Sequence, residues 1–458
     1  MEKARGPKPH AISFFLLFAC LLLALCPDTF ALNPKLDLSQ YAHTSWNIRD
    51  GFPRAEISSI AQTPDGYLWL GTESGLFRFD GVRSLLWRPP SNQDLPSNWI
   101  FSLLVSRDGT LWIGTSKGLA SWKDGTLTQY GELAGRYIFK LLEDREGTVW
   151  ASGMAVPAGK LCAIRNGSVQ CFGDDGSLGR GVFNLYEDRK ANLWAGVKDG
   201  LWLWKPGPPK FYPLLGEPDG IECFGEDNDG TLLVAWNGGI HRFVDGKTQV
   251  FAIPGRAGQI RGRRMLRDRD GSLWIGTFNE GLVHVHDGKT DVFGLSQGLS
   301  GEAARVLFED REGTVWVASG NGLDRFREFA ISAFSVNQGF SSPRVQSVLA
   351  DRNGGIWVTT PASLDRWNEG KVSILKDKGF LPNSLFEDDA GRLWISTPFG
   401  FGYLKNRAPR RRHRQRRLSA WLSRRLKTWR GAPRTRAIIR RCADANYSDS
   451  QRSIKLAT

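Results

Sequence analysis

Few side chains in the sequence combine a residue type and a spacing that support chemistry. His284 and His286 lie two residues apart in a strand-like run, so both imidazoles should face the same side and could hold a metal ion. A pair lacks the third protein ligand of a catalytic zinc site, so we expect no metal ion here. The Asp-x-x-Gly turns at 227–230 and 268–271 bring carboxylates together, but they lack the alternating ligands and the distant Glu of an EF-hand loop. Capping of the turn is the better interpretation of these aspartates.

The sequence shows no other motif for catalysis or cofactor binding. It has no Ser nucleophile elbow, no Walker loop and no dinucleotide-binding fingerprint. None of the six His residues lies in a helical context suited to phosphotransfer. We therefore expect no catalytic residues, no cofactor and no enzyme activity in this chain.

The elements that must position any site are repeats with a period of about 40 residues. Each copy reads as an apolar strand, an Asp-x-x-Gly turn, a Trp-centred strand, a Gly-Leu pair and an aromatic-bearing strand, as in residues 309–326. The unit recurs about nine times, and Leu233 replaces the central Trp in the fifth copy. In the other copies we interpret the Trp as core packing between neighbouring repeats: Trp69, Trp112, Trp150, Trp194, Trp274, Trp316, Trp357 and Trp394.

Four short strand-like runs per period, separated by turn residues, predict an all-β fold, a β-propeller of four-stranded blades. Residues 32–56 lead into the repeats. Because residues 329–349 resemble residues 41–60, we interpret the copies as one seven-bladed ring at 32–328 and two blades of a second ring at 329–406. A single nine-bladed ring is the alternative. Some aromatic residues could line a ligand groove, although ordinary blade packing is the preferred interpretation: Trp99, Trp202, Trp204 and Trp236.

Two cysteines flank a predicted hairpin turn at Asn166-Gly167. Counting outward from the turn places Cys162 opposite Cys171 as a non-hydrogen-bonded pair, the pair type in which the two Cα atoms lie closest. This spacing is compatible with a disulfide, and two buried free thiols are the alternative. We interpret Cys223 as a lone core thiol.

Both ends of the chain differ from the repeats in composition. Residues 1–31 read as a signal peptide, with a positive start, an apolar run and an A-x-A-like cleavage site, so we expect export to the periplasm. An uncleaved membrane anchor is the alternative. Residues 407–458 hold 17 Lys/Arg and two Asp/Glu, which leaves 44 Lys/Arg and 45 Asp/Glu in residues 1–406. The net charge of +14 therefore belongs to this tail.

The basic tail has three interpretations. It could be an arm for phosphate-rich partners, a segment that lies on a membrane surface, or the product of a frameshift. The repeat pattern stops in mid-blade after Asn406, which favours the frameshift because a functional tail would more naturally follow a completed blade.

The repeats resemble the two-component regulator propeller family. The resemblance is carried by residues 106–119 and 270–277 and extends over about residues 41–406. Members of this family typically carry two seven-bladed propellers outside the cytoplasm, followed by an Ig-like domain, a membrane helix and a histidine kinase. The resemblance therefore implies the ligand-sensing region of a two-component sensor histidine kinase. This chain lacks the kinase, and we expect it to be truncated.

The same resemblance implies the class of partner. The expected ligand is an extracellular small molecule such as a carbohydrate, with contact residues that the sequence does not identify, and a homodimer is one arrangement of the chain. We expect no nucleic acid partner, and membrane association only through an uncleaved N-terminal segment or the missing C-terminal region. Two other functions stay open: a propeller enzyme of the lyase or glycosidase type that acts at the central opening, and an exported binding or adhesion scaffold.

Overall fold

The computed structural model describes residues 32–405, apart from 35, 49–51, 54, 91–92, 155–158, 215–219, 237–238, 329–333, 362, 369–370 and 376–380. The expected signal peptide and the basic tail lie outside the described residues. The chain divides into two compact units, Met1–Ser332 and Ala333–Thr458. The described part is built from β-strands and short 3-10 turns, η1 (Leu38–Gln40), η3 (Gly131–Leu133), η4 (Leu295–Gln297) and η5 (Val336–Gln338). Within it, no helix has the length and apolarity needed to cross a bilayer.

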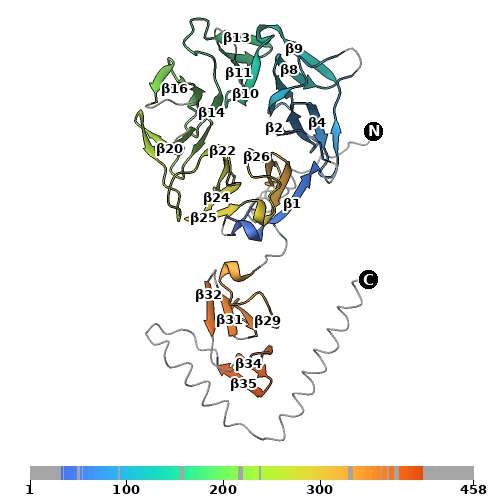
Figure 1. Ribbon diagram of the computed structural model, residues 1–458, viewed down its shortest axis with the longest axis vertical. Coiled ribbons are helices and arrows are strands. Elements are labelled where there is room, and N and C mark those ends of the chain that lie inside the picture. Colours follow the sequence, from blue (N-terminus) through green and yellow to red (C-terminus); the bar gives the residue numbers. More distant parts are fainter. Residues whose placement is uncertain are drawn as a thin grey trace, which may run out of the picture. The chain divides into compact units, whose positions relative to one another are not determined.

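Unit 1 is a β-propeller in which four-stranded antiparallel sheets surround a central axis (Figure 1). The inner strand of each sheet lies beside the inner strand of the next sheet around the ring. Six sheets take consecutive strands from the chain: β2 (Ile57–Gln62), β3 (Leu68–Thr72), β4 (Gly75–Phe79), β5 (Ser84–Leu86); β6 (Ile100–Val105), β7 (Leu111–Thr115), β8 (Gly118–Lys123), β9 (Thr126–Tyr130); β10 (Tyr137–Glu143), β11 (Val149–Met154), β12 (Lys160–Arg165), β13 (Ser168–Phe172); β14 (Asn184–Glu187), β15 (Leu193–Val197), β16 (Gly200–Lys205), β17 (Lys210–Pro213); β18 (Cys223–Glu226), β19 (Leu232–Trp236), β20 (Gly239–Val244), β21 (Lys247–Val250); β22 (Gly262–Arg267), β23 (Leu273–Thr277), β24 (Leu282–His286), β25 (Lys289–Phe293).

The seventh sheet combines the two ends of the ring. It contains β26 (Ala304–Glu309), β27 (Val315–Ser319) and β28 (Gly322–Arg327), and β1 (Ala42–Asn47) adds its outer strand. β1 pairs antiparallel with β28, and β26 lies beside β2 of the first blade. The sequence analysis treated residues 32–56 only as a lead-in, whereas the structure gives them the strand that closes the ring.

Each repeat contains the same hydrogen-bonded turn. In the third blade, Asp144 Oδ1 accepts hydrogen bonds from the backbone N–H groups of Glu146 and Thr148, and Oδ2 accepts one from Trp150 Nε1 at 2.8 Å. The aspartates therefore cap the turns, as expected, and also fix the indole rings. The same Trp-to-Asp bond recurs at Asp188, Asp268, Asp310, Asp351 and Asp388. Hydroxyl groups of Thr63 and Ser106 replace the carboxylate in the first two blades.

The repeat tryptophans supply much of the packing between blades. Seven of the eight are buried, and Trp274 has no exposed surface. Trp394, in the last sheet of unit 2, is partly exposed. Leu233, which replaces the Trp in the fifth blade, is fully buried as well. Burial of so many large side chains at equivalent positions explains why the ring needs no helices to form a core.

An arginine in the turn of one blade holds the next blade. Arg145 donates from its guanidinium to the backbone carbonyls of Asp188 and Arg189, and its own N–H donates to Glu187. Arg311 makes the equivalent contacts from the seventh blade to Gln62 and Thr63 of the first. This Arg latch recurs at Arg107 and Arg269. The repeat pattern alone did not indicate this latch, because its partners lie in the neighbouring copy of the repeat.

The third blade contains a disulfide between Cys162 and Cys171, which pair directly across β12 and β13 with a Cα–Cα distance of 4.0 Å. Cys223 is a free, buried thiol. Unit 2 holds a four-stranded sheet, β29 (Ser347–Ala350), β30 (Ile356–Thr360), β31 (Ser363–Asn368) and β32 (Lys371–Leu375), and a three-stranded sheet, β33 (Ser384–Glu387), β34 (Arg392–Thr397) and β35 (Gly400–Lys405). A small core formed by Trp357, Leu364, Leu393 and Ile395 joins these two sheets.

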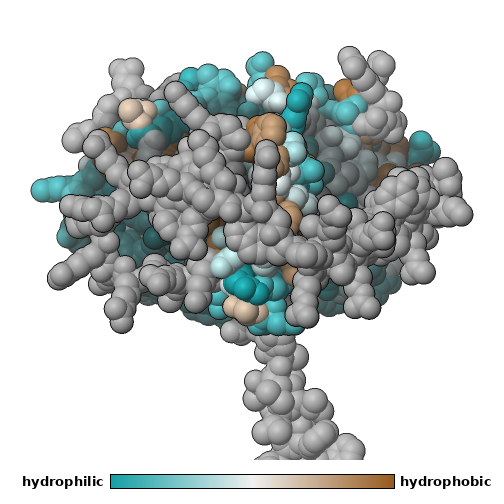
Figure 2. All heavy atoms as spheres, turned by 90° about the horizontal axis from the view of Figure 1, so that it is seen from below, coloured by the Kyte–Doolittle hydropathy of each residue, from teal (hydrophilic) through white to brown (hydrophobic). Residues whose placement is uncertain are grey.

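Figure 2 shows brown hydrophobic residues scattered among teal hydrophilic ones. Single exposed hydrophobic residues are normal on soluble proteins.

Candidate ligand-binding site

The propeller has two faces, which carry different connecting segments. The Asp-x-x-Gly turns connect the first and second strand of each blade, and we call the face that carries them the turn face. The segments that lead from the outer strand of one blade to the inner strand of the next, such as 87–99 and 131–136, lie at the other end of the inner strands. We call this end the connection face. The central channel opens between the starts of the inner strands on the connection face.

Most blades of the ring have an irregular pairing at the start of the inner strand. In five blades the register shifts by one residue and leaves a bulged residue, Ser58, Phe101, Phe139, Arg263 or Arg305. Phe183 and Glu222 occupy the same position in the other two, where their N–H groups donate to carbonyls of the neighbouring strand. A bulge redirects a side chain away from the regular alternation of a strand. These seven residues form what we call the bulge ring.

One side of the bulge ring is aromatic. Phe101 stacks against Phe139 with a centroid distance of 4.9 Å and against Trp99 at 5.1 Å. Tyr137 lies 5.9 Å from Phe101, and Phe183 lies 6.4 Å from Phe139. Trp99 and Tyr137 are 47% and 42% exposed. We call this group the aromatic arc, and it offers flat apolar faces to solvent at the connection face.

The opposite side of the bulge ring is charged. Arg263 and Arg305 lie close enough for their charges to interact, and Glu222 and Glu56 lie nearby. Burial lowers the pKa of Arg263, and the neighbouring Arg305 and Arg264 lower it further. Arg263 also lies over the ring of Phe278 at 5.1 Å. The connection face thus presents an aromatic side and a charged side.

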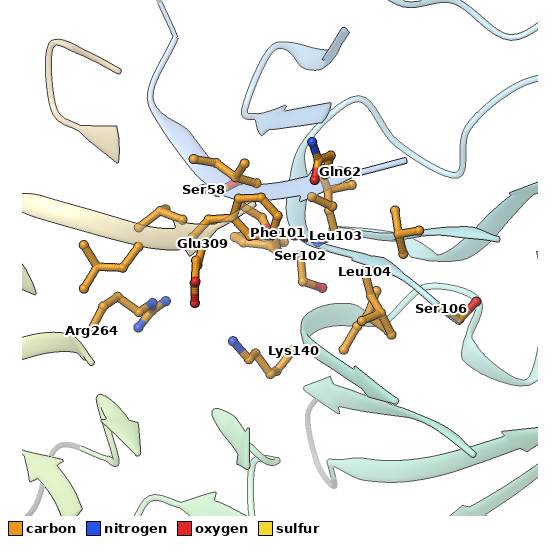
Figure 3. A pocket seen from close by; sticks show the side chains of 18 of the residues that line it. Ser58, Gln62, Phe101, Ser102, Leu103, Leu104, Ser106, Lys140, Arg264 and Glu309 are labelled. Carbon is orange, nitrogen blue, oxygen red and sulfur yellow. Dashed lines mark hydrogen bonds between the residues drawn. The ribbon is translucent and has the colours of Figure 1, made fainter. Parts of the chain in front are cut away.

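The channel itself contains a cavity of about 610 Å³, lined by the inner strands β2, β6, β10, β22 and β26. Figure 3 shows Lys140, Arg264 and Glu309 pointing into this space from three different strands. Arg264 is held in place because its guanidinium donates to the backbone carbonyls of Glu222 at 3.0 Å and Arg263 at 2.9 Å. The remaining wall contains Gln62, Arg107 and Arg311 as well as hydrophobic and hydroxyl-bearing side chains, with Phe101 and Phe139 next to the opening.

Two of the charged groups in the channel titrate near neutral pH. Burial lowers the pKa of Lys140 to about 8, and the nearby Arg264 acts in the same direction. Burial raises the pKa of Glu309 to about 7, although the guanidinium of Arg269, 3.4 Å from Glu309 Oε1, opposes this shift. Below neutral pH the channel therefore carries net positive charge, which suits an anionic group.

The aromatic candidates from the sequence fall into two groups. Trp99 belongs to the aromatic arc. Trp204 is buried in the core between blades, Trp202 packs against that core, and Trp236 stacks on His241 at 4.0 Å. Blade packing therefore accounts for three of the four. His284 and His286 lie in β24, away from the channel lining, with their rings stacked at 4.5 Å.

The sequence analysis did not identify the bulge ring, although its position is regular. Each bulge residue precedes the central Trp, or Leu233 in the fifth blade, by the same interval along the chain, from Ser58 and Trp69 to Arg305 and Trp316. Lys140 and Arg264 directly follow their bulge residues. If the copies of the repeat are aligned on their central Trp, the bulge residues fall in one column. Lys140 and Arg264 fall in the next column. Both columns contain residues of different chemical types, so neither forms a recognisable motif.

Three segments match the family model described as two component regulator propeller, at residues 51–74, 94–117 and 255–279. The matched segments contain Trp69, Trp112 and Trp274, so three of the repeats resemble this family. The propeller built by these repeats also resembles solved sensor domains. A comparison with curated proteins gave no match.

Two solved structures are extracellular domains of hybrid two component systems from B. thetaiotaomicron. One superposes with a TM-score of 0.58 at 19% identity and covers 80% of this chain and 53% of that domain. The other has a TM-score of 0.52 at 17% identity, with coverages of 80% and 52%. Virginiamycin B lyase from Staphylococcus aureus gives a TM-score of 0.51 at 14% identity, with coverages of 63% and 100%. At these identities the likeness shows the fold, and this chain spans about half the length of the two sensor domains.

Proposed function

We propose that this chain is the ligand-sensing propeller region of an extracytoplasmic sensor in a two-component signal transduction system. The repeat family and the fold shared with extracellular sensor domains support this function. The proposal includes export by the N-terminal segment and coupling of the propeller to a histidine kinase. Ligand binding would be passed to that kinase by a change in packing or in dimerisation of the propeller.

The observation that carries the proposal is the aromatic arc beside the basic channel. Stacked Phe101 and Phe139 stand next to the opening of a cavity that also contains Lys140 and Arg264. Aromatic faces pack well against sugar rings and other flat ligands, and a fixed guanidinium binds carboxylate or sulfate groups. We therefore propose that the ligand is a carbohydrate or similar small molecule with an anionic group, bound from the connection face.

A binding experiment with matched variants tests this proposal. The full chain is screened by thermal shift against neutral and acidic oligosaccharides of equal length, and hits are measured by calorimetry. We expect an acidic oligosaccharide to bind. Lys140→Gln should lower the affinity about tenfold because it removes a charge contact, and Phe101→Ala should lower it by a similar factor because it removes a stacking face. Phe211→Ala, which removes an exposed aromatic away from the channel lining, is the control and should bind normally.

Two results would contradict the proposed site. Neutral and acidic oligosaccharides could both fail to bind while the protein remains folded, which would remove the proposed ligand class. A ligand could also bind equally well to the Phe101 and Lys140 variants and to wild type, which would place its site elsewhere on the protein.

A second candidate function is elimination chemistry in the channel. The pKa values of Lys140, about 8, and Glu309, about 7, lie in the range that suits a general base and a general acid at neutral pH. In such a reaction the Lys140 amine would take a proton next to a carbonyl group, while the leaving group departs from the adjacent carbon. An acidic oligosaccharide incubated with the chain should then gain a double bond detectable by ultraviolet absorbance, and Lys140→Gln should abolish this change. Binding without any such change favours the sensor.

A further inference from the structure

A cluster outside the channel combines two histidines with a carboxylate. His284 and His286 lie on β24, and Asp291 lies directly opposite His284 on β25. One potential ligand atom from each of the three residues lies within 4.8 Å of those of the other two. Ligands about 2.1 Å from a tetrahedral ion are about 3.4 Å apart, so small side-chain rotations bring all three onto one ion. The sequence had indicated only the pair, and the structure adds the third ligand.

His284 is the unexplained member of this cluster. Its side chain has no exposed surface, and neither ring nitrogen has a hydrogen-bond partner among the described residues. The ring lies between Trp274, 4.3 Å away, and His286. A neutral imidazole nitrogen without a hydrogen-bond partner can donate its lone pair to a metal ion. Buried polar groups without partners are uncommon and need an explanation.

The contacts of His286 define which nitrogen faces the cluster. Its Nδ1 lies 2.9 Å from the backbone carbonyl of Pro34, which can only accept, so Nδ1 carries a proton. Its Nε2 lies 2.9 Å from Asp291 Oδ2, which also only accepts when ionised. Nε2 must therefore carry a second proton or bind a cation shared with Asp291. A carbonyl that orients the remote nitrogen of a histidine is the usual support for a metal ligand.

The N-terminal segment covers the cluster. The backbone N–H of Leu38 donates to Asp291 Oδ2 at 2.9 Å, which orients the carboxylate. Asp37 Oδ1 lies 3.9 Å from His286 Nε2 and can supply a fourth ligand. Leu38 is buried in the same core cluster as Trp274. Among the described residues, these contacts come from Pro34, Asp37 and Leu38, which lie shortly before the ring-closing strand β1.

We propose that His284, His286 and Asp291, with Asp37 as the fourth ligand, form a buried structural zinc site that fastens residues 32–41 to the sixth blade. Two imidazoles and two carboxylates are suitable ligands for zinc, and a buried position with four protein ligands is typical of a structural site. The site stabilises ring closure because the segment that it holds continues directly into β1. This inference is independent of the proposed sensing function.

Metal content and thermal stability of the wild-type full chain give the first test. The protein is expressed with zinc, purified without chelator and measured by elemental analysis before and after treatment with EDTA. We expect about one zinc per chain, a lower Tm after EDTA, and recovery of the Tm with zinc chloride. Protein without zinc, whose Tm responds to neither EDTA nor zinc chloride, would overturn the proposal without the need for any variant.

A substitution with opposite predicted outcomes gives the second test. If His284 is a ligand, His284→Leu should lose the zinc and lower the Tm, and residues 32–41 should become more accessible to protease. If it is only an unpaired core imidazole, Leu should leave the metal content unchanged and keep or raise the Tm, because it removes two unsatisfied nitrogens. His241→Leu, a histidine of the neighbouring blade outside the cluster, should retain the zinc. Zinc retained by His284→Leu is adventitious and refutes the site.

Discussion

The contact between His43 and Asp324 gives a quantitative test of how the ring closes. His43 lies on β1 and Asp324 on β28, with Nε2 2.9 Å from Oδ1, and the Asp324 side chain has no exposed surface. Asp324 also accepts hydrogen bonds from the backbone N–H and the hydroxyl of Ser300. The His43 ring packs 4.9 Å from both Phe293 and Phe326, so a leucine can fill much of the same space.

These contacts set the expected size of the effect. His43→Leu removes one donor from a buried carboxylate, and a hydrogen bond to a charged group contributes about 1.5–3 kcal/mol. Because Ser300 still donates to Asp324, we expect a loss of about 2 kcal/mol in the free energy of unfolding. With an m-value of about 3 kcal/mol/M, the urea midpoint should fall by about 0.7 M.

Urea unfolding followed by tryptophan fluorescence measures this change, and hydrogen exchange locates it. Residues 42–47 should exchange faster in His43→Leu, whereas the strands of the third blade should exchange as in wild type. His241→Leu is the matched control, since His241 is only half-buried and Nδ1 has no partner in the described structure. Equal midpoints for the two variants would refute the reasoning, because the His43 contact would then contribute nothing to closure.

Three further predictions concern the disulfide, the Arg latch and the channel. Replacing Cys162 and Cys171 by Ser should lower the free energy of unfolding by about 2–3 kcal/mol, and reductant should destabilise wild type but not this variant in urea unfolding. Arg311→Ala should lower the free energy of unfolding by about 1–2 kcal/mol, because the contacts of Arg311 join the seventh blade to the first. An unchanged urea midpoint would show that the Arg latch does not contribute to stability. The affinity for an anionic ligand should fall as the pH rises through about 7 and 8, because Glu309 gains a negative charge and Lys140 loses a positive charge. Calorimetry across this pH range measures the affinity. An affinity that does not change with pH would show that neither group faces the ligand.

The sequence was sufficient to predict the strands and turns of each blade, but it did not predict how the ring closes. The spacing of Trp, Gly and Asp within each copy is local, so it indicates the strands and turns of one blade directly. β1 pairs with a strand more than 270 residues away in the chain, as the contact between His43 and Asp324 shows. Nothing in the pattern of residues 42–47 specifies that partner, because any exposed sheet edge can accept an extra strand.

The same holds for the candidate sites: pairs of residues close in the sequence could be predicted, whereas groups of residues far apart in the sequence could not. Counting outward from a hairpin turn paired Cys162 with Cys171, and the same count from the Asp-Gly turn at 287–288 pairs His284 with Asp291. The metal cluster was therefore partly within reach of the sequence. Lys140 and Arg264 were not, because only the closed ring brings β10 and β22 to the same channel.

A crystal structure of the full chain with the tightest-binding acidic oligosaccharide tests the central claim most directly. The account predicts electron density for the ligand at the connection face, with a sugar ring against Phe101 and Phe139 and its anionic group beside Lys140 and Arg264. Density at the turn face or on the outer strands, with the channel free of ligand, would contradict the account and show that the channel is not the sensing site.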